Sequence, residues 1–255
     1  MKIGLALSGG GARGIAHVGV IKALEEIGLT FACISGTSAG AIVGALYAYG
    51  YKSAEMLEII QQLTVFKSFR MAWTWSGLLK MDGMKDLLLK FMPDNNFNKL
   101  KIPLTIAATE IRLGEVYYFT EGELVPAIMA SCSIPAVFSP LRYQGGLFVD
   151  GGVFDNLPAG VLKGKCDFLV GSHCNQIPKE FDPKNMKVVI ERTLLMAINA
   201  NTQVSKSMCD ALIEPPGLGK YGSFDIAKSQ EMFDFAYRYT KENFTKKYFD
   251  RAWAV

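Results

Sequence analysis

The first half of the chain alternates short apolar runs with longer stretches in which apolar residues recur at helical spacing. The runs KIGLALS and FACIS predict two buried strands. Each is followed by a predicted helix, from about Gly14 to Ile27 and from Ala39 to about Tyr49. Strands and helices that alternate in this order are typical of a parallel sheet. We therefore expect an α/β fold with a mainly parallel central sheet covered by helices on both faces.

The second half continues this pattern and then changes. Shorter helical runs are predicted near 123–130 and 158–163, and the further predicted strands are Pro103–Thr109, Val116–Thr120, Gly146–Asp150 and Asp167–Ser172. Residues 185–214 and 225–248 both have helical periodicity and are joined by the breaker PPGLGKYGS. We expect a single domain over residues 1–255 with a helical C-terminal tail at about 185–250.

Composition narrows the class of protein. Hydrophobic residues make up 50% of the chain and the mean hydropathy is +0.19, but no uninterrupted apolar run reaches the ~18 residues of a membrane span. The N-terminal run Ile3–Leu7 is too short for a signal peptide, so we expect a cytoplasmic protein. A net charge of +3 without a dense Lys/Arg cluster argues against nucleic-acid binding. Five cysteines without C-x-x-C spacing argue against disulfides and against a metal site.

A glycine-rich loop follows the first predicted strand. In SGGGARG, the residues Gly9, Gly11 and Gly14 satisfy the dinucleotide-binding pattern G-x-G-x-x-G. That pattern expects a carboxylate at the end of the second strand, and CISGTS has none there. Bare backbone N–H groups at the start of a helix suit any anion, including the oxyanion of acyl transfer. We therefore expect no nucleotide cofactor and an anion-binding role for the loop.

Ser38 lies between Gly36 and Gly40 in CISGTSAGAIVG, where a predicted strand passes into a predicted helix. The G-x-S-x-G spacing at such a junction is typical of a nucleophile elbow, whose crowded turn requires small neighbours. The alternative is that Ser38 only caps the helix, because serine is a favoured N-cap residue. Its place one strand and helix after an anion-binding loop favours the nucleophile.

The chain has only two histidines that could activate Ser38. His17 lies near the start of the first predicted helix, where a packing or capping role is common. His173 ends a predicted strand and remains a candidate, because catalytic groups of α/β sheets gather at strand ends. Neither has a recognisable catalytic context.

Asp150 is a better candidate for the base. It ends the apolar strand GLFVD, and Gly151 and Gly152 directly after it leave room for a substrate or another backbone. The alternative is that Asp150 opens an ordinary Asp-Gly turn. We interpret the nearby Asp155 and Asn156 as turn or capping residues.

The ordered motifs GGGARG, GTSAG and DGG, with ASCSIPAVFSPL ahead of the aspartate, resemble the patatin-like phospholipase family from Lys2 to about Ser172. The resemblance implies a patatin-like fold with a serine–aspartate dyad, in which Ser38 is the nucleophile and Asp150 the base. It also implies an oxyanion hole and a set of motif glycines. The implied oxyanion-hole residues are Gly9, Gly10, Gly11 and Arg13, with Arg13 bracing the loop of the three glycines. The further motif residues are Gly14, Gly36, Gly40, Gly151 and Gly152.

The resemblance implies a lipid acyl hydrolase of the phospholipase A or lysophospholipase kind, working through an acyl-enzyme and needing no metal or other cofactor. Two alternatives stay open: a soluble carboxylesterase or thioesterase, and a non-catalytic acyl-chain binding protein. The aromatic and basic segment 65–92 predicts either a lid with peripheral contact to the inner membrane surface or a helical hairpin packed on the core. Homo-oligomerisation is left open.

Overall fold

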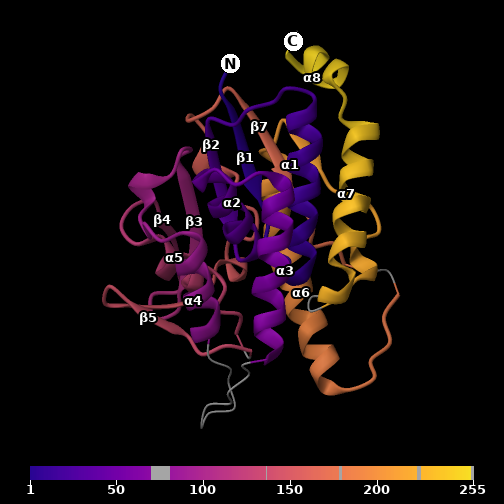
Figure 1. Cartoon of the computed structure of the whole chain (residues 1–255). Helices are drawn as coiled ribbons and strands as arrows, with labels where there is room; N and C mark the ends of the chain where they lie inside the picture. Colours follow the sequence, from indigo (N-terminus) through magenta and orange to yellow (C-terminus); the bar gives the residue numbers. More distant parts are fainter. Residues whose placement is uncertain (70–80, 136, 178–179, 223–224, 254–255) are drawn as a thin grey trace.

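The computed structural model describes residues 1–69, 81–135, 137–177, 180–222 and 225–253 (Figure 1). Its described part is built around one mixed sheet in the order β5-β6-β3-β2-β1-β7-β8, with β4 also paired to β3. The strands are β1 (Ile3–Leu7), β2 (Cys33–Thr37), β3 (Leu104–Glu110), β4 (Glu115–Phe119), β5 (Leu141–Tyr143), β6 (Gly146–Asp150), β7 (Phe168–Ser172) and β8 (Ala211–Ile213). Pairing is parallel from β3 through β2, β1 and β7 to β8, and antiparallel where β4, β5 and β6 join. The predicted α/β fold with a mainly parallel sheet is confirmed.

Helices account for most of the remaining chain. They are α1 (Ala16–Glu26), α2 (Ala39–Tyr49), α3 (Ser53–Phe69), α4 (Asp82–Phe91), α5 (Leu124–Ser131), α6 (Met186–Ser207), α7 (Ser229–Asn243) and α8 (Lys246–Trp253). Short 3-10 helices follow two of the strands, at Gly11–Ile15 after β1 and at Gly151–Val153 after β6. Among the described helices, none combines the length and the apolar character needed to cross a membrane.

The two faces of the sheet are buried in two separate hydrophobic clusters. Along β1, Leu5 and Leu7 point into the larger cluster, which also contains residues of α1 to α5 and α7. Ala6 points the other way, into a smaller cluster with Leu157 and Leu162. The alternation follows from the two-residue period of a strand, and it makes β1 apolar throughout because both of its faces are covered.

The C-terminal region is helical, as predicted, and its helix α7 packs on the core. In Figure 1, α7 lies beside α1, and both chain termini are at the top of the molecule. A Cβ atom at Gly19 would lie 2.4 Å from the carbonyl oxygen of Phe233, so α1 and α7 are in direct backbone contact. Tyr237 Oη also donates to Glu26 Oε2 at 2.7 Å.

Three predictions of local structure were wrong in part. The helix predicted near 158–163 is only a 3-10 turn, Gly160–Leu162. Glycine has a low helix propensity and the segment is short, so a longer helix is not favoured. The helix predicted over 185–214 ends at Ser207, and Ala211–Ile213 forms β8 on β7. The last helical segment is broken after Asn243 into α7 and α8. Strand β5 was not predicted.

The predicted lid or membrane segment, 65–92, is described only in part. Residues 70–80, which include Trp73 and Trp75, lie outside the described residues. The described helix α4 packs Leu87 and Leu88 into the main core and leaves Lys85 and Lys90 exposed. This part of the segment therefore agrees with the packed-hairpin alternative.

Candidate active site

Ser38 occupies a strained turn between β2 and α2. Its backbone has φ 53° and ψ −120°, a region that residues with a side chain seldom adopt. Small residues surround the turn: a Cβ at Gly36 would lie 2.5 Å from the Gly40 oxygen, and one at Gly40 would lie 2.4 Å from the Leu7 oxygen. Ser38 stands at the N-cap of α2, but its side chain makes no capping hydrogen bond. The capping alternative is therefore wrong.

The backbone of Ser38 is held by a residue that the sequence did not single out. Ser38 N–H donates to Ser131 Oγ at 2.7 Å, and this hydroxyl donates to the Ala107 carbonyl oxygen at 2.6 Å. Ser131 is fully buried at the end of α5. It belongs to the ASCSIPAVFSPL segment, so the only signal for it was the family resemblance of that segment.

The end of β6, which carries Asp150, meets the end of β2, because β2 and β6 share one edge of β3. Some β3 residues that pair with β4 also pair with β2, and others also pair with β6. Because a strand has only two edges, β4 lies along one edge of β3, and β2 and β6 lie one after the other along the opposite edge. Along that shared edge, Thr37 lies opposite Ala107 and Asp150 lies opposite the next residue, Ala108. The strand that leads to Ser38 therefore ends where the strand that carries Asp150 ends.

Asp150 is fixed through both its backbone and its side chain. Its N–H donates to the Ser133 oxygen at 2.9 Å, and its Oδ1 accepts from Gly152 N–H at 2.8 Å. The residue is 7% exposed. A Cβ at Gly151 would lie 2.3 Å from the Ala107 oxygen, so the chain after Asp150 passes directly against β3. Asp150 does open a turn, as the alternative holds, and the hydrogen bond from Gly152 N–H in this turn holds its carboxyl group.

The glycine loop presents fewer free N–H groups than we expect from the sequence. Gly9 N–H donates to the Asn156 carbonyl oxygen at 3.0 Å and is therefore engaged within the fold. Gly10 and Gly11 stand at the start of the 3-10 helix, where N–H groups have no partner within the helix. Gly11 has φ 60°, which favours glycine. Gly10 and Gly11 are thus the stronger candidates for an oxyanion hole.

Asn156 lies among these loops, although we interpret it from the sequence as a turn or capping residue. A Cβ at Gly9 would lie 2.5 Å from Asn156 Oδ1 and 3.3 Å from Ser38 Cβ. A Cβ at Gly152 would lie 3.0 Å from the same Oδ1. Asn156 is 2% exposed. Its amide therefore fills the space that Gly9 leaves open, beside Ser38.

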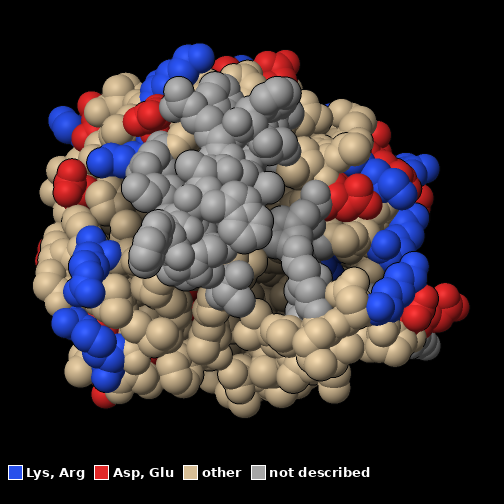
Figure 2. Space-filling model, turned by 90° about the horizontal axis from the view of Figure 1, so that it is seen from below, with Lys and Arg blue, Asp and Glu red and all other residues tan. Residues whose placement is uncertain are grey.

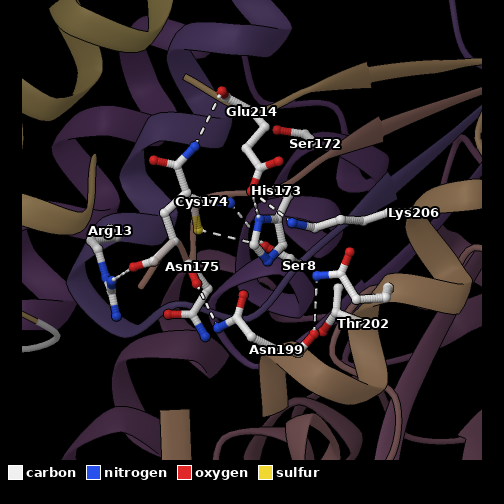
Figure 3. A network of polar contacts seen from close by, with 12 residues as sticks. Ser8, Arg13, Ser172, His173, Cys174, Asn175, Asn199, Thr202, Lys206 and Glu214 are labelled. Carbon is white, nitrogen blue, oxygen red and sulfur yellow. Dashed lines mark hydrogen bonds and ion pairs between the residues drawn. The ribbon is translucent and has the colours of Figure 1, made fainter. Parts of the chain in front are cut away.

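Arg13 and Gly14 tie the glycine loop to neighbouring segments. Arg13 is buried in the 3-10 helix, and its contacts include a donation from Nη1 to the Gln176 oxygen at 3.1 Å (Figure 3). A Cβ at Gly14 would lie 2.3 Å from Ala39 Cβ, so the loop packs directly on the start of α2. These contacts support the prediction that Arg13 braces the loop.

His17 lies beneath the glycine loop and is fully buried. Its Nδ1 lies 2.7 Å from Ser172 Oγ, and its Nε2 lies 2.8 Å from the Ser8 carbonyl oxygen and 3.4 Å from Cys174 Sγ. Burial disfavours the charged form, but Cys174 and Ser8 together hold the pKa of His17 above its ordinary value. A Cβ at Gly10 would lie 2.5 Å from Cys174 Sγ, so the thiol also packs against the loop.

His173 forms part of a separate ion-pair cluster, drawn in Figure 3. Its Nδ1 donates to Glu214 Oε1 at 2.8 Å, and Lys206 Nζ contacts the same oxygen at 2.7 Å. Burial lowers the pKa of His173, although Glu214 partly offsets this effect. In the described part of the chain neither histidine hydrogen-bonds to Ser38, so the contacts do not support a triad. Among the described residues, no cluster of three or more His, Cys, Asp or Glu could hold a metal ion.

Comparisons with known proteins agree on one family. A family model described as patatin-like phospholipase matches residues 5–163. An uncharacterized NTE family protein of Mycobacterium tuberculosis is 36% identical over 165 residues, which cover 64% of this chain and 46% of the relative. The lysophospholipase nte1 of Aspergillus niger is 28% identical over 281 residues, which cover 96% of this chain and 18% of the relative. The chain thus spans less than half the length of these curated relatives.

A solved structure shares the fold. The crystal structure of VipD from Legionella pneumophila aligns with a TM-score of 0.51 and 16% sequence identity, over 91% of this chain and 66% of that one. At this identity the likeness concerns the fold alone.

Proposed function

Because this chain belongs to the patatin-like phospholipase family, we propose that it is a serine lipid acyl hydrolase with Ser38 as nucleophile and Asp150 as base. One observation carries the proposal. Ser38 is held in a strained turn without a capping bond, and the strand ending in Asp150 meets the strand leading to Ser38 at neighbouring positions along β3. The name of the Aspergillus niger relative, a lysophospholipase, supports a lipid ester as the substrate class.

The proposed reaction begins when Ser38 Oγ attacks the acyl carbonyl carbon and its proton passes to Asp150. The carbonyl electron pair moves to the oxygen, and the N–H groups of Gly10 and Gly11 receive this oxyanion. When the C=O bond re-forms, the alcohol leaves and takes the proton from Asp150. Water then attacks the acyl-enzyme and gives a proton to Asp150, and the fatty acid leaves as Ser38 regains its proton.

A carboxylate is a weak base for a hydroxyl, since its ordinary pKa is about 3.9. Asp150 is 7% exposed, so its carboxyl group is largely shielded from water. Preorganised N–H groups stabilise the oxyanion that forms in the transition state, and this lowers the activation barrier for attack by Ser38. Shielding from water and preorganised N–H donors are the two features that support a dyad without histidine in this proposal.

The test is intact-protein mass spectrometry after exposure to a fluorophosphonate ester, for wild type, Ser38→Ala and Asp150→Asn. We expect a single adduct on wild type and none on the Ser38 variant. Asp150→Asn should react much more slowly at the same melting temperature. An adduct that persists on Ser38→Ala would remove Ser38 as the nucleophile. A folded wild type that forms no adduct would favour the acyl-chain binding alternative.

The substrate class is tested with esters of increasing chain length. A lipid acyl hydrolase should show a kcat/KM that rises from acetyl to long-chain esters and should release fatty acid from lysophospholipid vesicles. A carboxylesterase should prefer short soluble esters and ignore the vesicles. A preference for thioesters over the matching oxygen esters would favour the thioesterase.

Peripheral contact with an anionic inner membrane surface, through 65–92, is the remaining part of the proposal. Seen from below, Lys and Arg side chains lie along two opposite margins of the molecule (Figure 2). On α4, Lys85 and Lys90 are exposed. Lys85→Glu with Lys90→Glu should weaken co-sedimentation with anionic vesicles. The same charge change at Lys246 and Lys247, exposed on α8 at the opposite end in Figure 1, should not. Equal binding by both double variants would overturn this contact.

A further inference from the structure

Asn156 is the point at which the loops of the candidate site meet. Its carbonyl oxygen holds Gly9 N–H at 3.0 Å. Its Oδ1 lies where a Cβ at Gly9 or at Gly152 would otherwise be, at 2.5 and 3.0 Å from those positions. The same Gly9 position is 3.3 Å from Ser38 Cβ, and the same Gly152 position is 3.1 Å from Asp150 Oδ1. The amide of Asn156 therefore lies close to both Ser38 and Asp150.

The donor of this amide has nothing to bind in the described part of the chain. Asn156 Nδ2 is buried and has no hydrogen-bond partner there. A buried donor without a partner is rare in folded proteins, because the group loses water and gains nothing in return. At a catalytic site the missing partner can be a group that exists only during the reaction.

We propose that Asn156 is a catalytic residue of the oxyanion hole, donating from its side-chain amide beside the N–H groups of Gly10 and Gly11. The proposal rests on the acyl transfer proposed above. Rotation about the last side-chain bond of Asn156 exchanges Oδ1 and Nδ2, so the amide can present its donor to the space beside Gly9 and Ser38. Gly9 N–H already donates to the backbone carbonyl oxygen of Asn156 and is not free to bind an oxyanion. The side-chain amide of Asn156 takes its place as a donor.

The proposed donor acts in a single balanced step. Ser38 Oγ forms its bond to the carbonyl carbon while its proton passes to Asp150, and the π electron pair of the C=O bond moves to oxygen. Asn156 Nδ2–H donates to this oxygen as it becomes negative and keeps its own proton. The hydrogen bond weakens again when the C=O bond re-forms and the alcohol leaves.

The test compares Asn156→Ala, Asn156→Asp and the control Asn201→Ala, with kcat, KM, melting temperature and the rate of phosphonylation of Ser38 by a fluorophosphonate. Asn201 is a matched control because its Nδ2 donates to the Val153 oxygen at 3.0 Å, in the same loop after Asp150, from the exposed side of α6. Aspartate has the shape of asparagine but places a negative charge where the oxyanion forms.

We expect Asn156→Ala to lower kcat about 10²–10³-fold, the usual cost of one oxyanion donor, with KM nearly unchanged. Asn156→Asp should lower kcat further, and phosphonylation should slow in parallel in both variants. Asn201→Ala should retain wild-type kcat. If Asn156 only fills space, the order reverses, because aspartate keeps the shape and alanine does not.

Three outcomes would overturn the inference. They are an Asn156→Asp variant as active as wild type, an Asn156→Ala variant within threefold of wild-type kcat, and losses that appear in KM alone. These outcomes differ from a failure of the proposed function, in which wild type itself neither turns over esters nor forms an adduct.

Discussion

Replacing Ser131 with alanine should destabilise the protein and slow its reaction, although Ser131 is neither nucleophile nor base. Its hydroxyl accepts from Ser38 N–H at 2.7 Å and donates to the Ala107 oxygen at 2.6 Å, and all of this is buried. The substitution removes both hydrogen bonds and adds no group that could replace them. Ser38 would then keep its positive φ with nothing to hold its N–H group.

The magnitude follows from these two bonds. A buried N–H left without a partner costs about 1–3 kcal/mol, and the second hydrogen bond contributes about 1 kcal/mol. The expected loss of unfolding free energy is therefore about 2–4 kcal/mol. For a chain of this size, each kcal/mol lowers the melting temperature by about 2–4 °C. We expect a decrease of roughly 4–16 °C, together with a lower kcat because Ser38 is less well placed.

The matched control is Ser133→Ala, two residues further on. Ser133 is equally buried, but its hydroxyl donates to the Met129 oxygen at 2.9 Å, a local bond across the C-terminal end of α5. Its carbonyl oxygen, which binds Asp150 N–H, remains in the alanine variant. This control should lose about 0.5–1.5 kcal/mol and keep most of its kcat. Thermal melts followed by circular dichroism and steady-state ester hydrolysis measure both effects.

Equal losses of stability and kcat in the two serine variants would refute the reasoning. The hydrogen bond from Ser38 N–H to Ser131 would then contribute no more than the local bond of Ser133. A Ser131→Ala variant with wild-type kcat would also refute it. The stability loss alone would not suffice as support, since any buried hydroxyl contributes something.

Three further predictions concern the two catalytic loops and the ion-pair cluster. Asp150→Asn should keep the hydrogen bond from Gly152 N–H and the melting temperature but lower kcat about 10²–10⁴-fold, and near-normal turnover in the ester assay would exclude Asp150 as base. Gly9→Ala should lose activity and about 1–3 kcal/mol, because the new Cβ would lie 2.5 Å from Asn156 Oδ1; a wild-type urea midpoint would contradict this. Glu214→Gln should lower stability at pH 7. Burial alone would raise the pKa of Glu214, but hydrogen bonds from His173 and Lys206 outweigh it and lower the pKa from 4.5 to about 2. The stabilisation is therefore complete above about pH 4.5 and lost as the pH falls towards 2, so urea titrations at several pH values should show wild type and variant converging only in that acid range.

The sequence was most informative where local rules decide the structure. The helix predicted from Ala39 to about Tyr49 and the strand Gly146–Asp150 have the predicted bounds. Here the glycine motifs mark the ends of apolar runs, so periodicity and turn chemistry agree. The order of the motifs also named the family, which the match over residues 5–163 confirms.

Elements that depend on distant partners were less predictable. The strand Ala211–Ile213 has three residues and no turn signal of its own, and it exists because it pairs with β7. Ser131 matters because of a hydrogen bond to Ser38, a residue 93 positions away in the chain. Asn156, in the loop after β6, lies beside Gly9, in the loop after β1. No local pattern carries such information, since each contact forms only when the sheet brings the segments together.

A dyad places a stricter demand on the backbone than a triad does. In a triad the histidine is held by a third residue and carries the proton between two groups that need not touch. In the proposed dyad the serine and the carboxylate must meet directly. A displacement of either backbone would therefore change the reacting geometry directly. One segment supports both backbones, since Ser131 holds Ser38 N–H and Ser133 holds Asp150 N–H, while Asn156 holds Gly9 N–H. If the dyad is the catalytic unit, substitutions at these supports should lower kcat even where both catalytic groups are intact.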